Sequence, residues 1–162
     1  MRITNTLSGQ KEDFQPSGDV VRFYVCGMTP KFHPHVGHAR IFVAADIMRR
    51  YLEYRGLHVR HVQNFTDIDD KIIARAADEG GSAAEVARKY TDSYFEAMDR
   101  LNVLRAHEYP SVTGVMAGHP WSRHNFTRCR IRLMSLLSAF CSSTSSNSPG
   151  LLFFFGAAMG RK

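Results

Sequence analysis

An apolar run over residues 20–26 is the first clear element along the chain, and its β-branched and aromatic residues are typical of a buried strand. Gly27 and Pro30 interrupt this run. Between residues 39 and 52 the apolar positions recur largely at helical spacing, and Gly56 follows as a suitable helix end. The pattern therefore predicts a strand, a loop and a helix in that order.

The next residues extend this pattern to a second strand. Residues 57–62, Leu-His-Val-Arg-His-Val, alternate between residue types as strand residues do. A strand, a helix and a strand over this length form a βαβ unit, in which the strands are parallel and the crossover is right-handed. We therefore expect an α/β fold that begins a doubly wound, Rossmann-like parallel sheet.

Two further helices are expected after the second strand. The first covers residues 67–78, with acidic residues in its first turn and a glycine pair after its end. The second covers residues 82–101, where Ser82 and Glu85 form a capping-box pattern. Its expected apolar face consists of Val86, Tyr90, Tyr94, Phe95, Met98 and Leu101.

The two ends of the chain differ from the rest. Residues 1–19 form a polar, turn-rich lead-in with one short strand expected around residues 3–7. Residues 114–162 hold no acidic residue and include a serine-rich, low-complexity stretch. We therefore divide the chain into an α/β unit of residues 1–113 and a basic tail that is disordered or foreign to the fold. An altered reading frame or a retained intron would produce such a tail, and an unrelated natural extension is the alternative.

The net charge of +6 invites a nucleic-acid interpretation, but its distribution weakens that interpretation. Residues 1–108 hold 15 Lys and Arg residues and all 15 Asp and Glu residues, so this part is electrically balanced. The excess positive charge lies in the last 54 residues, with six basic residues and no acidic one. Net charge alone therefore supports no nucleic-acid contact by the α/β unit.

Cysteine usage and apolar run lengths indicate the compartment. Cys26, Cys129 and Cys141 give no paired framework and no C-x-x-C motif, so a disulfide scaffold is not expected. The N-terminus has no apolar signal core, and the longest apolar stretches fall short of the roughly 20 residues that a membrane helix needs. We expect no membrane contact and a reducing compartment, with the cytoplasm as the default and an organelle as the alternative.

His35, Val36, Gly37 and His38 stand at the first turn of the first predicted helix. Unpaired backbone N–H groups and the positive end of the helix dipole favour a phosphate at this place. Two imidazoles one turn apart add hydrogen-bond donors, and Gly37 would let a flat ring approach the backbone. The alternative is a pair of surface histidines that cap a helix.

This tetrapeptide resembles the signature of class I aminoacyl-tRNA synthetases. With Cys26-Gly-Met-Thr-Pro before it, Ala39-Arg after it and Asn64-Phe-Thr-Asp-Ile-Asp-Asp-Lys-Ile further on, residues 1–113 resemble the N-terminal part of cysteinyl-tRNA synthetases. The resemblance implies the first half of a Rossmann-like, nucleotide-binding catalytic domain. It implies a cysteine–tRNA ligase, which makes cysteinyl-adenylate from L-cysteine and ATP with magnesium and then transfers the acyl group to tRNA(Cys).

The resemblance also assigns roles to single residues. It implies that His35, Val36, Gly37 and His38 bind ATP, with the two histidines as the catalytic pair that stabilises charge at the α-phosphorus. It makes Cys26 a ligand of zinc, which would select the sulfur of cysteine over the hydroxyl of serine. A structural cysteine is the alternative for Cys26.

Small polar residues on the two loops after the strands are candidates for the substrate site. We expect Gly27, Thr29, Asn64 and Thr66 to contact the substrate amine, the adenylate or the sugar. Turn and cap chemistry is equally open, and Thr66 would then be the N-cap of the helix that begins at Asp67.

The remaining polar residues are given ordinary structural roles, with one exception. Asp67, Asp69 and Asp70 suggest a magnesium site, but a solvated acidic first turn is the favoured interpretation. We expect His58 and His61 to be strand residues. The exception is His33, which the resemblance makes a candidate neighbour of the zinc pocket.

Departures from the family keep other functions open. Lys31 and Phe32 replace an aromatic–acidic pair of the loop. The sequence has no Lys-Met-Ser-Lys-Ser-like loop and no anticodon-binding helical domain, so an inactive fragment with weak nucleotide binding is one alternative. A ligase that joins cysteine to a glucosaminyl-inositol sugar is another, although Lys71 stands where we expect a proline in that ligase.

Overall fold

The predicted βαβ unit is present in the computed structural model, which describes residues 1–5, 8–16, 19–116 and 151–154. Strands β3 (Val20–Val25) and β4 (His58–Gln63) are parallel and are joined through helix α1 (Val36–Tyr54). The register pairs Val20 with His58 and Val25 with Gln63. The α/β class and the parallel sheet are therefore confirmed.

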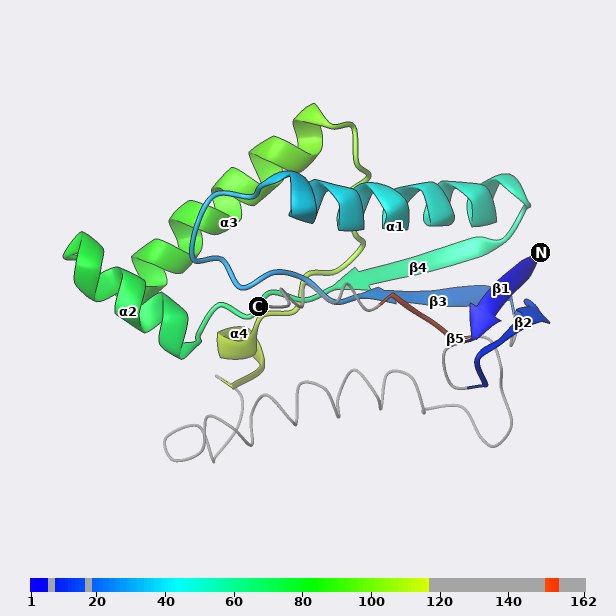
Figure 1. The fold of residues 1–162 in the computed structure, drawn as a ribbon, viewed down its shortest axis with the longest axis horizontal. Coiled ribbons are helices and arrows are strands. Elements are labelled where there is room, and N and C mark those ends of the chain that lie inside the picture. The colour runs from blue at the N-terminus through cyan, green and yellow to red at the C-terminus, as the bar shows by residue number, and fades with distance from the viewer. Residues whose placement is uncertain (6–7, 17–18, 117–150, 155–162) are drawn as a thin grey trace.

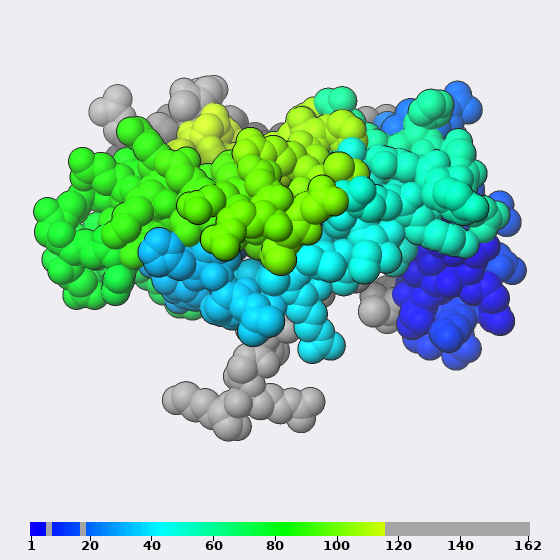
Figure 2. Space-filling view, turned by 90° about the horizontal axis from the view of Figure 1, so that it is seen from above, coloured from blue at the N-terminus to red at the C-terminus, as the bar shows by residue number. Residues whose placement is uncertain are grey.

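Among the described residues three helices follow β4, and the second and third of them lie on opposite faces of the sheet (Figure 1). Helices α2 (Asp70–Glu79) and α3 (Ala83–Arg100) form a hairpin at the end of the sheet toward which both strands run. Helix α3 lies beside α1 on one face (Figure 2), whereas the short α4 (Val112–Met116) lies on the other. In the described part of the chain, no helix has the length and apolar content to cross a membrane.

The sheet has a third strand, β5 (Leu151–Phe154), which pairs in parallel with β3 and gives the order β4-β3-β5. This strand belongs to the segment 114–162 that the sequence assigns to a foreign tail. Most of that segment lies outside the described residues, so the predicted division of the chain stays a prediction.

The sheet's two faces are packed differently. Val21, Phe23 and Val25 alternate along β3 and are at most 1% exposed, and they pack against the helix pair α1 and α3. The opposite face of β3 carries Tyr24, which packs with Val112 of α4. Each such buried aliphatic or aromatic side chain contributes roughly 1.5–3 kcal/mol by leaving water, so burial fixes which way β3 faces.

The N-terminal lead-in is a hairpin rather than a single strand. Strand β1 (Arg2–Asn5) pairs antiparallel with β2 (Gln10–Asp13). The sequence predicts only the first of these strands. The second is Gln-Lys-Glu-Asp and is exposed throughout, so it carries none of the apolar alternation on which strand prediction depends.

The boundaries of the α2–α3 hairpin confirm one prediction and correct two. Ser82 and Glu85 form the expected capping box of α3. Helix α2 begins at Asp70 rather than Asp67, because the side chain of Asp69 accepts from the backbone N–H of Lys71 and acts as the N-cap. Leu101 is 49% exposed and does not belong to the buried face of α3.

Candidate functional site

The loops that leave β3 and β4 are joined directly to each other. The backbone N–H of Gly27 donates to Oδ1 of Asn64 over 2.9 Å, and the backbone N–H of Thr66 donates to the carbonyl of Met28 over 3.3 Å. Because parallel strands end at the same edge of a sheet, these bonds connect the two segments where open α/β sheets place their ligands.

Gly27 and Asn64 touch so closely that only glycine fits. A Cβ atom on Gly27 would lie 1.5 Å from the backbone oxygen of Asn64. Asn64 is 4% exposed, and its Oδ1 also accepts from the hydroxyl of Tyr24 over 2.9 Å. Burial, with smaller contributions from Cys26, raises the pKa of Tyr24, so this hydroxyl stays a donor. The side-chain oxygen of Asn64 therefore holds the two loops together, and its predicted contact with a substrate stays a prediction.

His35 and His38 cap the start of α1 with their own rings. Nδ1 of His35 accepts from the backbone N–H of Gly37 over 3.0 Å, and Nδ1 of His38 accepts from the backbone N–H of His35 over 3.2 Å. A neutral imidazole that accepts at Nδ1 carries its proton on Nε2. Each ring therefore presents an Nε2–H donor at the N-terminus of a 19-residue helix.

His35 and His38 lie in direct contact, and this affects the charge of His38. The ring centroids of His35 and His38 are 4.1 Å apart. Partial burial, and after it the proximity of His35, lowers the pKa of His38, so this ring donates hydrogen bonds without a formal charge at neutral pH. An anion bound at the Nε2–H groups of the two rings would oppose this shift. His35 and Gly37 are exposed, so such a ligand has access from solvent.

The structure gives a local reason for a glycine at position 37, and the sequence does not reveal it. A Cβ atom at this position would lie 2.8 Å from Cε1 of His35, because the capping ring folds over the glycine. The neighbouring Val36 is 85% exposed. The cap alternative is therefore real for His35 and His38, and it is compatible with phosphate binding because it uses only the Nδ1 atoms.

Phe32 is a part of the site that sequence reasoning missed. Its ring stacks on His35 with centroids 5.8 Å apart and 10° between planes, and it lies 5.7 Å from the ring of His38. The sequence shows this residue only as a departure from the family's usual loop. An aromatic residue three positions before a histidine cap is the signal that would have indicated it.

The expected residues of the substrate site lie on the expected loops. Thr29 and Thr66 are partly exposed, one on each loop, and Cys26 is partly buried at the end of β3 beside Tyr24. Thr66 is not the N-cap of α2, since Asp69 has that role. Asp67 accepts from the backbone N–H of Thr113 over 3.0 Å and from its hydroxyl, so it fastens the start of α4.

The described residues do not form a zinc site. Among residues 1–5, 8–16, 19–116 and 151–154, no group of three or more His, Cys, Asp or Glu side chains could hold a metal ion. A protein zinc site needs three or four such ligands. Cys26 is one donor, and Cys129 and Cys141 lie outside the described residues.

Comparisons with known proteins agree on the kind of domain. The family described as tRNA synthetases class I (C) catalytic domain matches residues 14–119. The cysteine–tRNA ligase of Trichodesmium erythraeum is 51% identical over 114 residues, which are 70% of this chain and 23% of that protein. The cysteine–tRNA ligase of Pyrococcus horikoshii is also 51% identical, over 70% of this chain and 24% of its own length. The chain thus spans about a quarter of the length of these relatives.

Solved structures show the same fold. A Mycobacterium tuberculosis methionyl-tRNA synthetase in complex with methionyl-adenylate is 26% identical, with a TM-score of 0.51 over 53% of this chain and 17% of its own. The leucyl-tRNA synthetase of Agrobacterium radiobacter, solved as a ternary complex with tRNA, has a TM-score of 0.53 at 22% identity, over 81% of this chain and 16% of its own. The second likeness concerns the fold alone.

Proposed function

Because the chain belongs to the class I (C) family of tRNA synthetase catalytic domains, we propose that it forms the nucleotide-binding first part of a cysteine–tRNA ligase. The complete reaction joins the carboxylate of cysteine to the α-phosphorus of ATP and releases pyrophosphate. A hydroxyl of the terminal ribose of tRNA(Cys) then takes the cysteinyl group from the adenylate, and AMP is released. L-cysteine, tRNA(Cys) and ATP with its magnesium are the proposed partners, and the cytoplasm is the proposed compartment.

The observation that carries this proposal is the pair of Nε2–H donors on His35 and His38 at the start of α1. Their Nδ1 atoms are occupied by backbone N–H groups, so the rings are oriented before any ligand binds. Donors that are fixed in advance stabilise charge that develops on a phosphate without reorganising during the reaction. The two histidines act here by position and by electrostatics, and they transfer no proton.

The joined loops supply the place for the amino acid. The loops that follow β3 and β4 carry Gly27, Thr29 and Thr66, and hydrogen bonds join the two loops. The loop after β3 also leads directly to the histidine pair at the start of α1. We assign the amine and carboxylate of cysteine to these groups, and we place Cys26 beside the substrate sulfur. Since the described residues include no group of three or more His, Cys, Asp or Glu side chains that could hold a metal ion, the proposal assigns no step to zinc.

A second candidate function is nucleotide binding without ligase activity. The chain spans 23% of the length of its Trichodesmium relative. A nucleotide-binding fragment without ligase activity has the same histidine pair and the same joined loops. The two candidates differ in whether bound ATP reacts with cysteine.

Cysteine-dependent exchange of pyrophosphate into ATP by the purified 162-residue chain distinguishes them. The ligase proposal expects exchange that needs cysteine, ignores serine and is lost in His38→Ala. A matched control is His58→Ala, which removes an exposed histidine of β4 and leaves exchange unchanged. ATP binding without exchange supports the fragment, and a folded chain that does neither contradicts both candidates.

A further inference from the structure

His33 lies in the loop between β3 and α1, and it connects this loop to a helix far away in the sequence. Its Nδ1 lies 2.7 Å from Oγ of Ser93 in α3, although 60 residues separate them. Its ring also meets the ring of Tyr90 edge-on, with centroids 5.1 Å apart and 84° between planes. His33 is exposed, so burial does not explain why its ring takes this one position.

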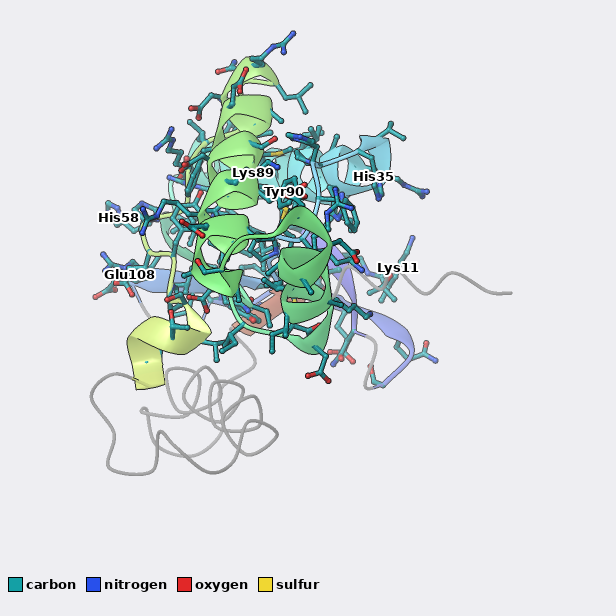
Figure 3. All side chains as sticks on the ribbon, turned by 90° about the vertical axis from the view of Figure 1, so that its left-hand side faces the viewer. Lys11, His35, His58, Lys89, Tyr90 and Glu108 are labelled. Atoms are coloured by element: carbon teal, nitrogen blue, oxygen red, sulfur yellow. The ribbon has the colours of Figure 1, made fainter. Side chains whose placement is uncertain are left out.

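The surface that receives His33 is firmly held. Tyr90 is 2% exposed and packs between α2 and α3. Its hydroxyl donates to Oε1 of Glu79 over 2.6 Å, and Glu79 is paired in turn with Arg75 at 2.6 Å and Lys89 at 2.8 Å. Figure 3 shows Tyr90 and Lys89 on α3, on the side of the molecule where His35 also lies. The α2–α3 hairpin therefore offers a rigid support for the loop.

Two features couple the position of His33 to the positions of the His35 and His38 rings. Pro34 has a fixed φ angle and restricts the backbone of His33, so little freedom remains between His33 and the cap residue His35. The preceding residue, Phe32, stacks on His35. Two adjacent side chains thus hold the loop from two directions, one against α3 and one against the imidazoles.

We propose that Ser93 and Tyr90 are positioning residues of the nucleotide site. They hold His33, and through it they fix the ring positions of His35 and His38 against the start of α1. This inference rests on the proposed function, because it takes those two rings to be the phosphate donors. Neither Ser93 nor Tyr90 touches the nucleotide.

The test compares Ser93→Ala with Ser93→Thr, which keeps the hydroxyl, and with Asp92→Ala, which removes an exposed neighbour on α3. Two quantities are measured on the whole chain: the dissociation constant for ATP and the imidazole NMR signals of His35 and His38. We expect Ser93→Ala to weaken ATP binding about 3- to 10-fold and to shift or broaden both signals. Ser93→Thr and Asp92→Ala should resemble the wild type.

A double-mutant cycle separates this route from general destabilisation. His33→Ala should weaken ATP binding as much as Ser93→Ala, and the double variant should show no additional loss, because both remove one contact. Additive losses, or unchanged His35 and His38 signals in folded Ser93→Ala, would overturn the proposal. If the wild type binds no ATP, the proposed function fails, and the NMR comparison still decides whether Ser93 positions the pair.

Discussion

The backbone N–H of Gly27 lies 2.9 Å from Oδ1 of Asn64, and this hydrogen bond joins the loops after two neighbouring parallel strands. The contact is close because the α-carbon of Gly27 faces the backbone oxygen of Asn64. Each loop carries part of the proposed site, so their separation would displace the candidate substrate residues from the histidine pair.

Replacement of Gly27 by alanine should separate the two loops. The new Cβ atom would lie 1.5 Å from a backbone oxygen, which cannot move aside as a side chain does. We expect a loss of more than about 3 kcal/mol in the free energy of unfolding, measured by urea denaturation.

Gly81→Ala is the matched control for this substitution. Its Cβ atom would lie 3.4 Å from the end of the flexible Glu85 side chain, so we expect a change within about 0.5 kcal/mol. Equal stability of the two alanine variants would show that the Gly27 contact is not tight in solution.

Removal of the Asn64 side chain should lower the free energy of unfolding more than removal of the Tyr24 hydroxyl. Asn64→Ala leaves the Gly27 N–H and the Tyr24 hydroxyl without their acceptor, so we expect a loss of about 2–3 kcal/mol. Tyr24→Phe removes one donor and should cost about 1 kcal/mol. Chemical denaturation of both variants tests this order, and a larger loss for Tyr24→Phe would contradict the role given to Asn64.

The start of α2 can be tested by two substitutions. Asp69→Ala removes the observed N-cap and should cost about 1 kcal/mol of stability. Thr66→Ala keeps the backbone bond to Met28 and should cost less than about 0.5 kcal/mol. Thermal unfolding measures both losses. A larger loss for Thr66→Ala than for Asp69→Ala would indicate that Thr66 is the N-cap.

The buried ring of His61 should make stability depend on pH. This ring is 4% exposed, and neither of its nitrogens has a hydrogen-bond partner among the residues that the structure describes. Burial, then Arg49 and His107, lowers the pKa of His61 from 6.5 to about 4, although Asp46 opposes the shift. The unfolded chain therefore takes up the proton first. The contribution of His61 to the free energy of unfolding is present above about pH 6.5. It is lost as the pH falls toward 4, and the loss is roughly 3 kcal/mol at most.

His61→Phe isolates this contribution, because phenylalanine fills a similar volume and does not titrate. The difference in unfolding free energy between the wild type and this variant, measured from pH 7.5 to pH 4.5, should change steadily in favour of the variant. A constant difference over this range would mean that His61 does not titrate differently in the folded and unfolded states.

The sequence predicts the architecture well where apolar periodicity is strong. Strand β3, helix α1 and helix α3 lie where the apolar pattern places them, since burial on one face decides their position. Strand β2 is missed because it is entirely polar. The start of α2 is misplaced by three residues, because three aspartates close together are all plausible caps and the tertiary contact of Asp67 with Thr113 removes one of them.

The candidate site is predictable in part. The motif around His35 and His38 identifies the pair and its place on a helix N-terminus. The neighbours that orient it are not visible in the sequence, since Ser93 and Tyr90 come from a distant helix. Asn64 shows the same limit, because its position after a strand suggests a ligand contact, whereas its bond to the backbone of Gly27 is not visible in the sequence.

The most direct test of the central claim is the dissociation constant of ATP, measured by calorimetry for the wild type, His38→Ala and His58→Ala. If the Nε2–H groups at the start of α1 hold the phosphates, His38→Ala should bind ATP at least about tenfold more weakly, whereas His58→Ala should match the wild type. Wild-type affinity in a folded His38→Ala variant would show that this pair is a helix cap and does not bind ATP.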